Sequence, residues 1–362
     1  MDHDGCQRSE PDPALRLWRR RAIARVAIVL GLGLGWGAAA GAASNAVRLP
    51  EGEFAGESWD LIASLDTGHR IVAQAALSNL GPGDHKAVVL GHLIGPDGSV
   101  VRFKRSEPAG KWALTGGGHG LDLHSISLDP FGPERRFVVA KDDLGIDLRL
   151  RRASAPAREQ KTGACSFELL EPGAPASVTL RLGARATAIA TQGRVALTHR
   201  WSSALESECV LRRVEVFGLE RELGFYFSET TTPQGDVSRW LVAERDGRVL
   251  FAGDPGDAPV RWGSAADGFA PPASARFAAA GLSARIDFEP AIASVDPTER
   301  LPATVQWLLQ TRTKPRLSWM RAPFELRTAT GTIVGEALAK VTYSNPLPRG
   351  RVPARVAAHS EK

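Results

Sequence analysis

Three side chains in the middle of the chain are candidates for catalysis or ligand binding. They are those of His199, Trp201 and Tyr226. His199 and Trp201 are two positions apart on a predicted strand, so both side chains project to one face. There an imidazole and an indole could line a ligand pocket, or could pack in an apolar core. Tyr226 lies in the apolar run 223–227 and faces away from its two Phe neighbours. The sequence leaves open which of those two faces is interior.

A second polar cluster, formed by His119, Asp122 and His124, follows three consecutive glycines. Asp122 and His124 would share a strand face, as metal ligands can, but no third ligand stands at a diagnostic spacing. The glycines predict a turn, because a strand pattern and not a helix N-terminus follows them. The sequence therefore predicts neither a metal site nor a cofactor, and it contains no Gly-x-Ser-x-Gly nucleophile motif.

The pattern of residues 1–44 predicts the cellular compartment of the protein. Four arginines between positions 19 and 25 precede an uncharged apolar stretch, 26–43, that ends in small residues, which is the pattern of an export signal. Gly31, Gly33, Gly35 and Gly37 weaken this stretch as a permanent helix, so the pattern favours a cleaved signal over an inner-membrane anchor formed by residues 22–43. We expect a periplasmic or otherwise exported protein. An arginine pair leaves both the Sec and the twin-arginine routes open.

Cysteine usage is consistent with export. Cys6 lies in the segment that a signal peptidase would remove, which leaves Cys165 and Cys209 as a pair. Two thiols in an oxidising compartment can form a disulfide, and a loop of this length would stabilise the fold by about 4 kcal/mol on the chain-entropy model. The alternative is two buried free thiols in strands.

The rest of the chain carries short strand signals separated by turns. Alternating runs at 71–79, 86–94 and 99–105 are divided by Gly-, Pro- and Asp-rich turns, and Asp97-Gly98 is a strong hairpin signal. Further predicted strands are 120–128, 136–141, 146–151, 166–170 and 177–182. With 37 Gly and 24 Pro along the chain, long helices are interrupted before they can start. The pattern predicts an all-β barrel or sandwich.

Composition excludes several classes of protein. With 43% hydrophobic and 23% charged residues, the chain is neither disordered nor a multi-span membrane protein. The net charge of +5 comes in part from the N-terminal arginines, and the body has no Lys/Arg-rich run. We therefore expect no nucleic-acid partner.

An internal repeat emerges at an offset of about 149 residues. The turn Asp97-Gly98 then falls on Asp246-Gly247, and a tryptophan-containing segment precedes each half's strands, at Trp59 and Trp201. Each turn follows two predicted strands, which are 71–79 and 86–94 in the first half and 223–229 and 238–244 in the second.

The repeat predicts two related β domains in tandem. We place the first at residues 50–200 and the second at 201–347, with a polar tail at 348–362. Residues 153–162 are predicted to form an exposed loop within the first domain.

The order of several features extends this picture. They are Glu57-Ser-Trp-Asp60, Gln74, the Pro96-Asp97-Gly98 turn, and His199 with Trp201. In this order the chain resembles the tandem-lipocalin family of bacterial carotenoid 1,2-hydratases (hydroxyneurosporene synthases), AttH-like exported proteins and survival-factor-like lipocalins, over most of residues 55–345. The resemblance implies two lipocalin-like antiparallel β-barrels, or strongly curved sandwiches, with an apolar cavity for an isoprenoid or other lipid. The implied ligand-binding residues are Trp59, Gln74, His199, Trp201 and Tyr226.

Hydratases of this family carry a His-x-Trp motif and a later Tyr-x-Asp motif that are tied to protonation of a carbon–carbon double bond. His199 and Trp201 match the first motif and Tyr226 matches the Tyr of the second, which makes these three the candidate catalytic residues. Ser228 stands where the Asp is expected, and a serine hydroxyl cannot protonate carbon. The adjacent Glu229 would point to the opposite strand face. Glu229 and Asp66 remain as candidate acids.

Three functions follow as hypotheses. The first is an exported lipocalin-like carrier or chaperone that binds a hydrophobic isoprenoid or lipid. The second is a hydratase that adds water to an isoprenoid double bond. The third is a non-catalytic structural β protein whose partner is a membrane transport complex.

Overall fold

The computed structural model describes residues 46–49, 51–79, 85–132, 134–151, 158–220, 223–245, 247–256, 259–265, 267–279, 281–296, 306, 310 and 313–346. The predicted signal or anchor at 1–44 and the polar tail at 348–362 lie outside these residues. Within the described part of the chain, no helix is both long enough and apolar enough to cross a membrane.

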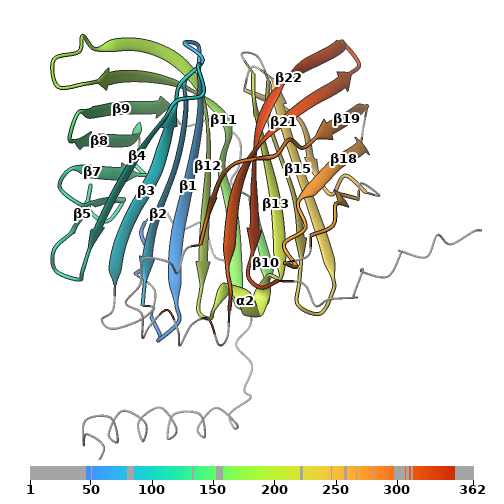
Figure 1. Ribbon diagram of the computed structural model, residues 1–362, viewed down its shortest axis with the longest axis horizontal. Coiled ribbons are helices and arrows are strands. Elements are labelled where there is room, and N and C mark those ends of the chain that lie inside the picture. The colour runs from blue at the N-terminus through green and yellow to red at the C-terminus, as the bar shows by residue number, and fades with distance from the viewer. Residues whose placement is uncertain are drawn as a thin grey trace, which may run out of the picture. The chain divides into compact units, whose positions relative to one another are not determined.

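Antiparallel strands make up most of the described chain, which confirms the all-β prediction (Figure 1). The 12 strands of the first sheet are β1 (Gly56–Leu65), β2 (Arg70–Ser78), β3 (Lys86–Ile94), β4 (Val100–Glu107), β5 (Ala113–Thr115), β6 (Gly120–Asp122), β7 (Ile126–Asp129), β8 (Glu134–Lys141), β9 (Leu144–Arg151), β10 (Arg158–Thr162), β11 (Cys165–Leu182) and β12 (Ile189–Ser202). A single helical turn, α2 (Glu206–Cys209), lies between the two sheets in the sequence.

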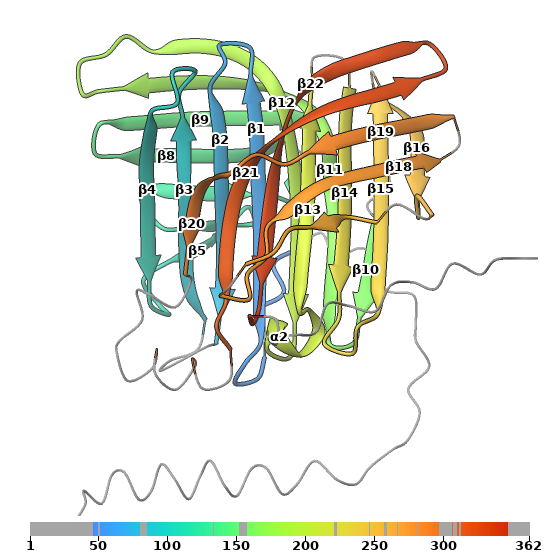
Figure 2. The same ribbon diagram turned by 45° about the vertical axis from the view of Figure 1, so that its right-hand side comes forward.

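The second sheet has 10 strands. They are β13 (Arg212–Leu219), β14 (Leu223–Thr231), β15 (Val237–Arg245), β16 (Arg248–Gly253), β17 (Arg261–Trp262), β18 (Pro272–Ala279), β19 (Leu282–Asp287), β20 (Ala291–Val295), β21 (Arg316–Thr328) and β22 (Gly331–Tyr343). Each sheet curls around its own apolar core, as both views of the ribbon show (Figures 1 and 2).

The strand order is similar in the two sheets. It runs β4-β3-β2-β1-β12-β11-β9-β8-β7-β6-β5 in the first sheet and β16-β15-β14-β13-β22-β21-β19-β18-β17 in the second. The turns of the two matched hairpins contain Gly98 and Gly247, both at positive φ, while Asp246 lies outside the described residues. The tryptophan part of the predicted repeat is wrong. Trp59 and Trp201 lie on adjacent strands of the first sheet, so they are not equivalent positions of the two halves.

Two local predictions also need correction around β11. The runs 166–170 and 177–182 are not separate strands, because β11 continues through irregular pairing between Leu169 and Ala174. The predicted loop 153–162 is in part a strand, since its end forms β10 and pairs with β11. Residues 152–157 lie outside the described residues.

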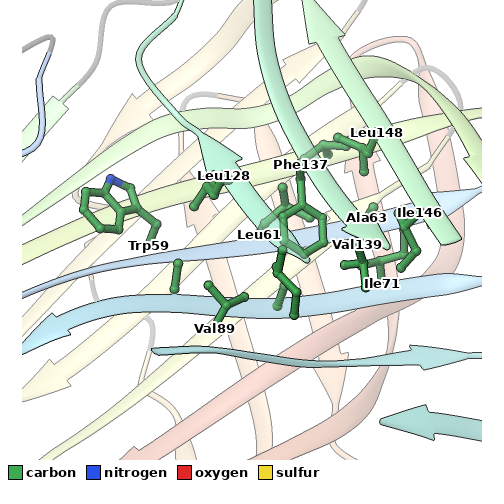
Figure 3. Close-up of a cluster of buried hydrophobic side chains, with 14 of the residues drawn as sticks. Trp59, Leu61, Ala63, Ile71, Val89, Leu128, Phe137, Val139, Ile146 and Leu148 are labelled. Carbon is green, nitrogen blue, oxygen red and sulfur yellow. The ribbon is translucent and has the colours of Figure 1, made fainter. Parts of the chain in front are cut away.

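Side-chain alternation gives each sheet two buried faces. In β1, Trp59, Leu61 and Ala63 point into the first barrel, where they pack against side chains such as Phe137 and Ile146 (Figure 3). The intervening Ile62 points to the other face and belongs to a cluster shared with the second sheet. The central strands are therefore buried on both sides.

The two sheets meet along a shared apolar layer. Ile62 and Val72 of the first sheet belong to one cluster with Phe217 and Trp240 of the second. The backbones come closest at Gly173 and Gly224, where a Cβ added to either would lie 2.7 or 2.9 Å from the other's Cα. Glycine at these positions lets β11 and β14 approach.

A disulfide joins Cys165, at the start of β11, to Cys209, at the end of α2, with a Cα–Cα distance of 6.1 Å. Both residues are buried against Val210. The bond ties the first sheet to the segment that leads into the second.

Replacing both cysteines by serine is expected to lower the free energy of unfolding by about 4 kcal/mol, because the bond closes a loop with a sequence separation of 44. Urea unfolding of the oxidised wild type and of Cys165→Ser/Cys209→Ser measures this. A reductant should shift the wild-type midpoint and leave that of the double variant unchanged. Equal midpoints for oxidised wild type and double variant would contradict the prediction.

Candidate functional site

The most chemically unusual group in the first barrel is His199, whose two ring nitrogens both face carboxylates. His199 Nε2 lies 2.8 Å from Oε1 of Glu57, and Nδ1 lies 3.3 Å from Oε2 of Glu168. The three residues come from β12, β1 and β11, which are neighbours in the sheet, and all are buried. Because β12 is the strand between the other two, its inward face is where the carboxylates converge.

This arrangement places proton donors and acceptors side by side. An ionised carboxylate only accepts hydrogen bonds, and neutral imidazole has one donor and one acceptor nitrogen. Each ring nitrogen of His199 lies within hydrogen-bond distance of one glutamate. The geometry therefore allows proton exchange between the imidazole and either carboxyl group, away from bulk water.

Aromatic rings surround the cluster. Trp59 stacks parallel to the His199 ring, with centroids 5.3 Å apart and an interplanar angle of 3°, and Trp201 packs at 4.7 Å with a tilt. Phe131 meets the imidazole edge-on at 5.2 Å. The faces of indole rings attract cations, so these rings suit a bound molecule that carries or develops positive charge.

A short segment, residues 46–49, covers this end of the barrel. The backbone N–H of Arg48 donates to Glu57 Oε2 at 2.8 Å, and the Arg48 guanidinium lies 3.8 Å above the Trp201 ring. Val47 donates its backbone N–H to Gly118 and packs on the barrel core. A ligand that reaches the His199 cluster from this end must displace the segment.

A separate polar network lies on the opposite face of the sheet, between the two domains. Asp60 is fully buried and accepts hydrogen bonds from Lys340 Nζ, at 2.8 and 2.7 Å, and from Arg200. Gln74 donates to the same carboxylate at 3.1 Å. Lys340 belongs to the second sheet and Asp60 to the first, so this carboxylate links the domains.

Arg200 extends the network across the interface. Its guanidinium also contacts Glu215 of the second sheet, which accepts a hydrogen bond from the Tyr226 hydroxyl at 2.9 Å. Burial alone would raise the pKa of Asp60, but Arg200 and Lys340 hold it well below its usual value. Burial, and then the charge of Glu215, raise the pKa of Tyr226 well above its usual value. Asp60 is therefore ionised in this network, and the Tyr226 phenol is neutral.

The structure divides the predicted site residues into two groups. Trp59, His199 and Trp201 come together inside the first barrel. Gln74 and Tyr226 lie on the interdomain face, because alternate side chains of a strand point to opposite sides. The predicted catalytic group of His199, Trp201 and Tyr226 is therefore not one constellation.

The residues at and beside the expected Tyr-x-Asp motif lie in two different places. Ser228 and Tyr226 line a small interdomain pocket together with Ser166. Glu229 points instead into the second barrel, where it accepts hydrogen bonds from Arg239 Nε at 2.8 Å and from two further groups. It does not contact the His199 cluster.

The other candidate acid and the candidate metal ligands lie elsewhere. Asp66 is exposed in the turn after β1, at the opposite end of that strand from Glu57. Asp122 accepts a hydrogen bond from the backbone N–H of His124 at 2.8 Å and so supports a turn. Within the described residues, no group of three or more His, Cys, Asp or Glu side chains is arranged to hold a metal ion.

Sequence reasoning missed Glu57 and Glu168 as functional residues. Glu57 carried a usable signal, since it precedes Trp59 by two positions and so shares its face. Glu168 carried none, because its partner His199 is 31 residues away and only strand pairing brings them together.

No protein-family model and no curated protein matches the chain, but solved structures do. An AttH-like protein of Nitrosomonas europaea matches with a TM-score of 0.57 at 15% identity, covering 88% of this chain and 99% of that one. CghA matches with a TM-score of 0.55 at 11% identity, over 84% and 96% of the two chains. Kievitone hydratase of Nectria haematococca matches with a TM-score of 0.51 at 10% identity, over 82% and 91%. These likenesses show that the chain has a lipocalin-like fold in two domains.

Proposed function

We propose that the protein is an acid catalyst that binds an unsaturated hydrophobic molecule, of the isoprenoid class, and adds water across a carbon–carbon double bond. The observation that carries the proposal is the buried His199 between Glu57 and Glu168 under two tryptophans. A carrier does not need such a cluster. Burying ionisable groups costs free energy, and clusters of such groups occur at catalytic sites.

The proposed reaction begins with a proton transfer. A proton passes from the His199 cluster to one alkene carbon, and the electron pair of the double bond forms the new C–H bond. The adjacent carbon becomes a cation, which the indole faces of Trp59 and Trp201 stabilise. Water adds through its oxygen, and its surplus proton returns to the cluster. The atoms balance as alkene plus water giving alcohol.

In the proposed reaction the His199 cluster takes the role of the acid expected in the Tyr-x-Asp motif. Ser228 leaves no carboxylate at that position, and the cluster of Glu57, Glu168 and His199 supplies one in the barrel interior. We further propose that the chain belongs with the carotenoid 1,2-hydratases and AttH-like proteins. Two neighbours of similar fold, the AttH-like protein and kievitone hydratase, support this assignment. On this proposal residues 1–44 direct export and the substrate is met in the periplasm.

The test is product formation in isotopically labelled water. Purified protein is incubated with an acyclic carotenoid such as lycopene in water enriched in heavy oxygen, and extracts are analysed by mass spectrometry. An alcohol that carries one heavy oxygen is expected from the wild type and not from His199→Gln. A folded wild-type protein that returns every tested isoprenoid unchanged would reject the hydratase.

A second function, that of a lipid carrier, is favoured by the apolar side chains that fill the interior of both barrels. It predicts that one class of lipid co-purifies and remains chemically unchanged. Loss of that lipid in a Trp59→Ala variant, with no product in the wild type, would favour the carrier over the enzyme.

A further inference from the structure

The mouth of the second barrel contains a buried cation without an acidic partner. Arg212, the first residue of β13, has only 5% of its surface exposed. Within the described residues, no carboxylate lies within ion-pair distance of its guanidinium, although its neighbour Arg213 is paired with Glu206. A buried charge without a counter-charge is energetically costly. An anion bound at this position would therefore stabilise the guanidinium.

The guanidinium is held in place by neutral groups. Arg212 Nε donates to Thr231 Oγ1 at 3.3 Å, and the guanidinium lies 4.0 Å from the centroid of the Trp262 ring. Tyr343 is its partner across the strands β13 and β22. Burial raises the pKa of Tyr343 to about 12, against the opposing effect of Arg212. Stacking on an indole orients the planar guanidinium, whose fork geometry matches a planar anion.

The nearby carboxylates are committed to other donors. Glu229 accepts from Arg239 at 2.8 Å, from the backbone N–H of Val260 at 3.1 Å and from Trp262 Nε1 at 3.4 Å. These bonds hold Trp262 where it covers Arg212. Asp267 is paired with Arg316 at 2.7 Å. Neither carboxylate is within ion-pair distance of Arg212.

The surroundings of the cation are apolar and aromatic. Tyr343 belongs to the core cluster of the second barrel, and the half-buried rings of Trp262 and Phe269 pack against that cluster. Both rings also meet the Tyr343 ring edge-on, at 6.0 and 5.5 Å. A ligand that places an anion on Arg212 would therefore set its remaining atoms against an apolar surface.

We propose that Arg212 is the anchor of a second binding site, which takes the carboxylate or phosphate head of an anionic amphiphile while its apolar chain lies against Trp262 and Phe269. The site is independent of the His199 cluster. β1 and β13 hold the same place in their sheets, and there Glu57 pairs with Trp201 whereas Arg212 pairs with Tyr343. The corresponding strands of the two barrels thus carry side chains of opposite charge type at or next to their first residue.

The experiment titrates the purified protein with dodecanoate, dodecyl phosphate and dodecanol below their aggregation concentrations, with calorimetry and tryptophan fluorescence as readouts. We expect saturable binding of at least one of the two anions, and the tighter one identifies the head group. Arg212→Gln should weaken that binding by about tenfold to a hundredfold, because it removes a charged hydrogen bond. Arg212→Lys, which keeps the charge but loses the planar fork, should retain part of the affinity.

The matched control is Arg213→Gln, which alters the neighbouring arginine on the opposite face of the same strand. Its affinity for the anion should stay within about twofold of wild type, since the site does not include it. Thermal melting checks that Arg212→Gln folds, and its melting temperature should equal or exceed that of wild type because an uncompensated buried charge is removed. Binding of dodecanol as tight as that of the anions would overturn the proposal. So would anion binding that is absent, or unchanged by Arg212→Gln.

Discussion

The variant Asp60→Asn is expected to unfold with a free energy about 3–5 kcal/mol below that of wild type, because it breaks a buried ion network by removing one partner. Lys340 loses its carboxylate, and Arg200 keeps only Glu215. These cations remain buried between the sheets, so their desolvation is no longer offset. Urea unfolding followed by circular dichroism gives the difference.

The matched control is Asp147→Asn, whose carboxylate pairs with Arg136 on the partly exposed face of β9. A pair of this kind contributes about 0–1 kcal/mol, since solvent screens it. If both variants lose the same small amount of stability, the interdomain network does not hold the domains together. The double variant Asp60→Asn/Lys340→Met should recover part of the loss, because it removes a buried cation together with its partner.

Acid should act on the same network. The pKa of Asp60 is lower in the folded protein than in the unfolded chain, owing to Arg200 and Lys340, which outweigh the effect of burial. Its stabilisation is therefore complete above the ordinary aspartate pKa of about 4 and is lost as the pH falls through the lower folded value. Wild type should lose more stability than Asp60→Asn over that acidic range. Parallel curves for the two proteins would contradict this.

The second large effect concerns catalysis. Glu57→Gln is expected to lower the rate of hydration by about 10²–10⁴-fold, the range attributed to a positioned acid. Glutamine keeps the shape and can still accept the His199 Nε2–H, but it carries no negative charge. The cluster then has one fewer carboxyl group that can take up a proton and deliver it to the substrate. Single-turnover kinetics with the labelled-water assay measures the chemical step.

The control is Asp66→Asn, which alters the exposed acid at the far end of β1. Its rate should stay within about twofold of wild type, because it lies outside the barrel interior. Glu168→Gln should resemble Glu57→Gln, since both carboxylates face the imidazole. Thermal melting separates lost chemistry from lost folding. A Glu57→Gln protein that keeps the wild-type rate would exclude the cluster as the acid.

The sequence predicts the fold well wherever the information is local. The hairpin around Gly98 and the strands at 71–79 and 86–94 agree with β2, β3 and β4, because alternation and turn residues act over a few positions. The errors arise where pairing overrides local pattern. The predicted strands 166–170 and 177–182 are separated by six residues that include Gly173, yet β11 runs through them with irregular pairing. Residues 158–162 are polar enough for a loop, but β11 provides a partner strand.

For the candidate site, the sequence alone predicts the direction of each side chain along its own strand. Two-residue spacing predicts that Trp201 and His199 share a face and that Tyr226 differs from its Phe neighbours. The sequence does not predict which strand face points into a barrel, or which side chains come into contact. The tertiary structure shows both. Glu57 is 142 residues from His199, and Asp60 is 280 from Lys340. Alternation is a property of one strand, whereas sheet register and the packing of two sheets decide which charges meet, and both depend on long-range contacts.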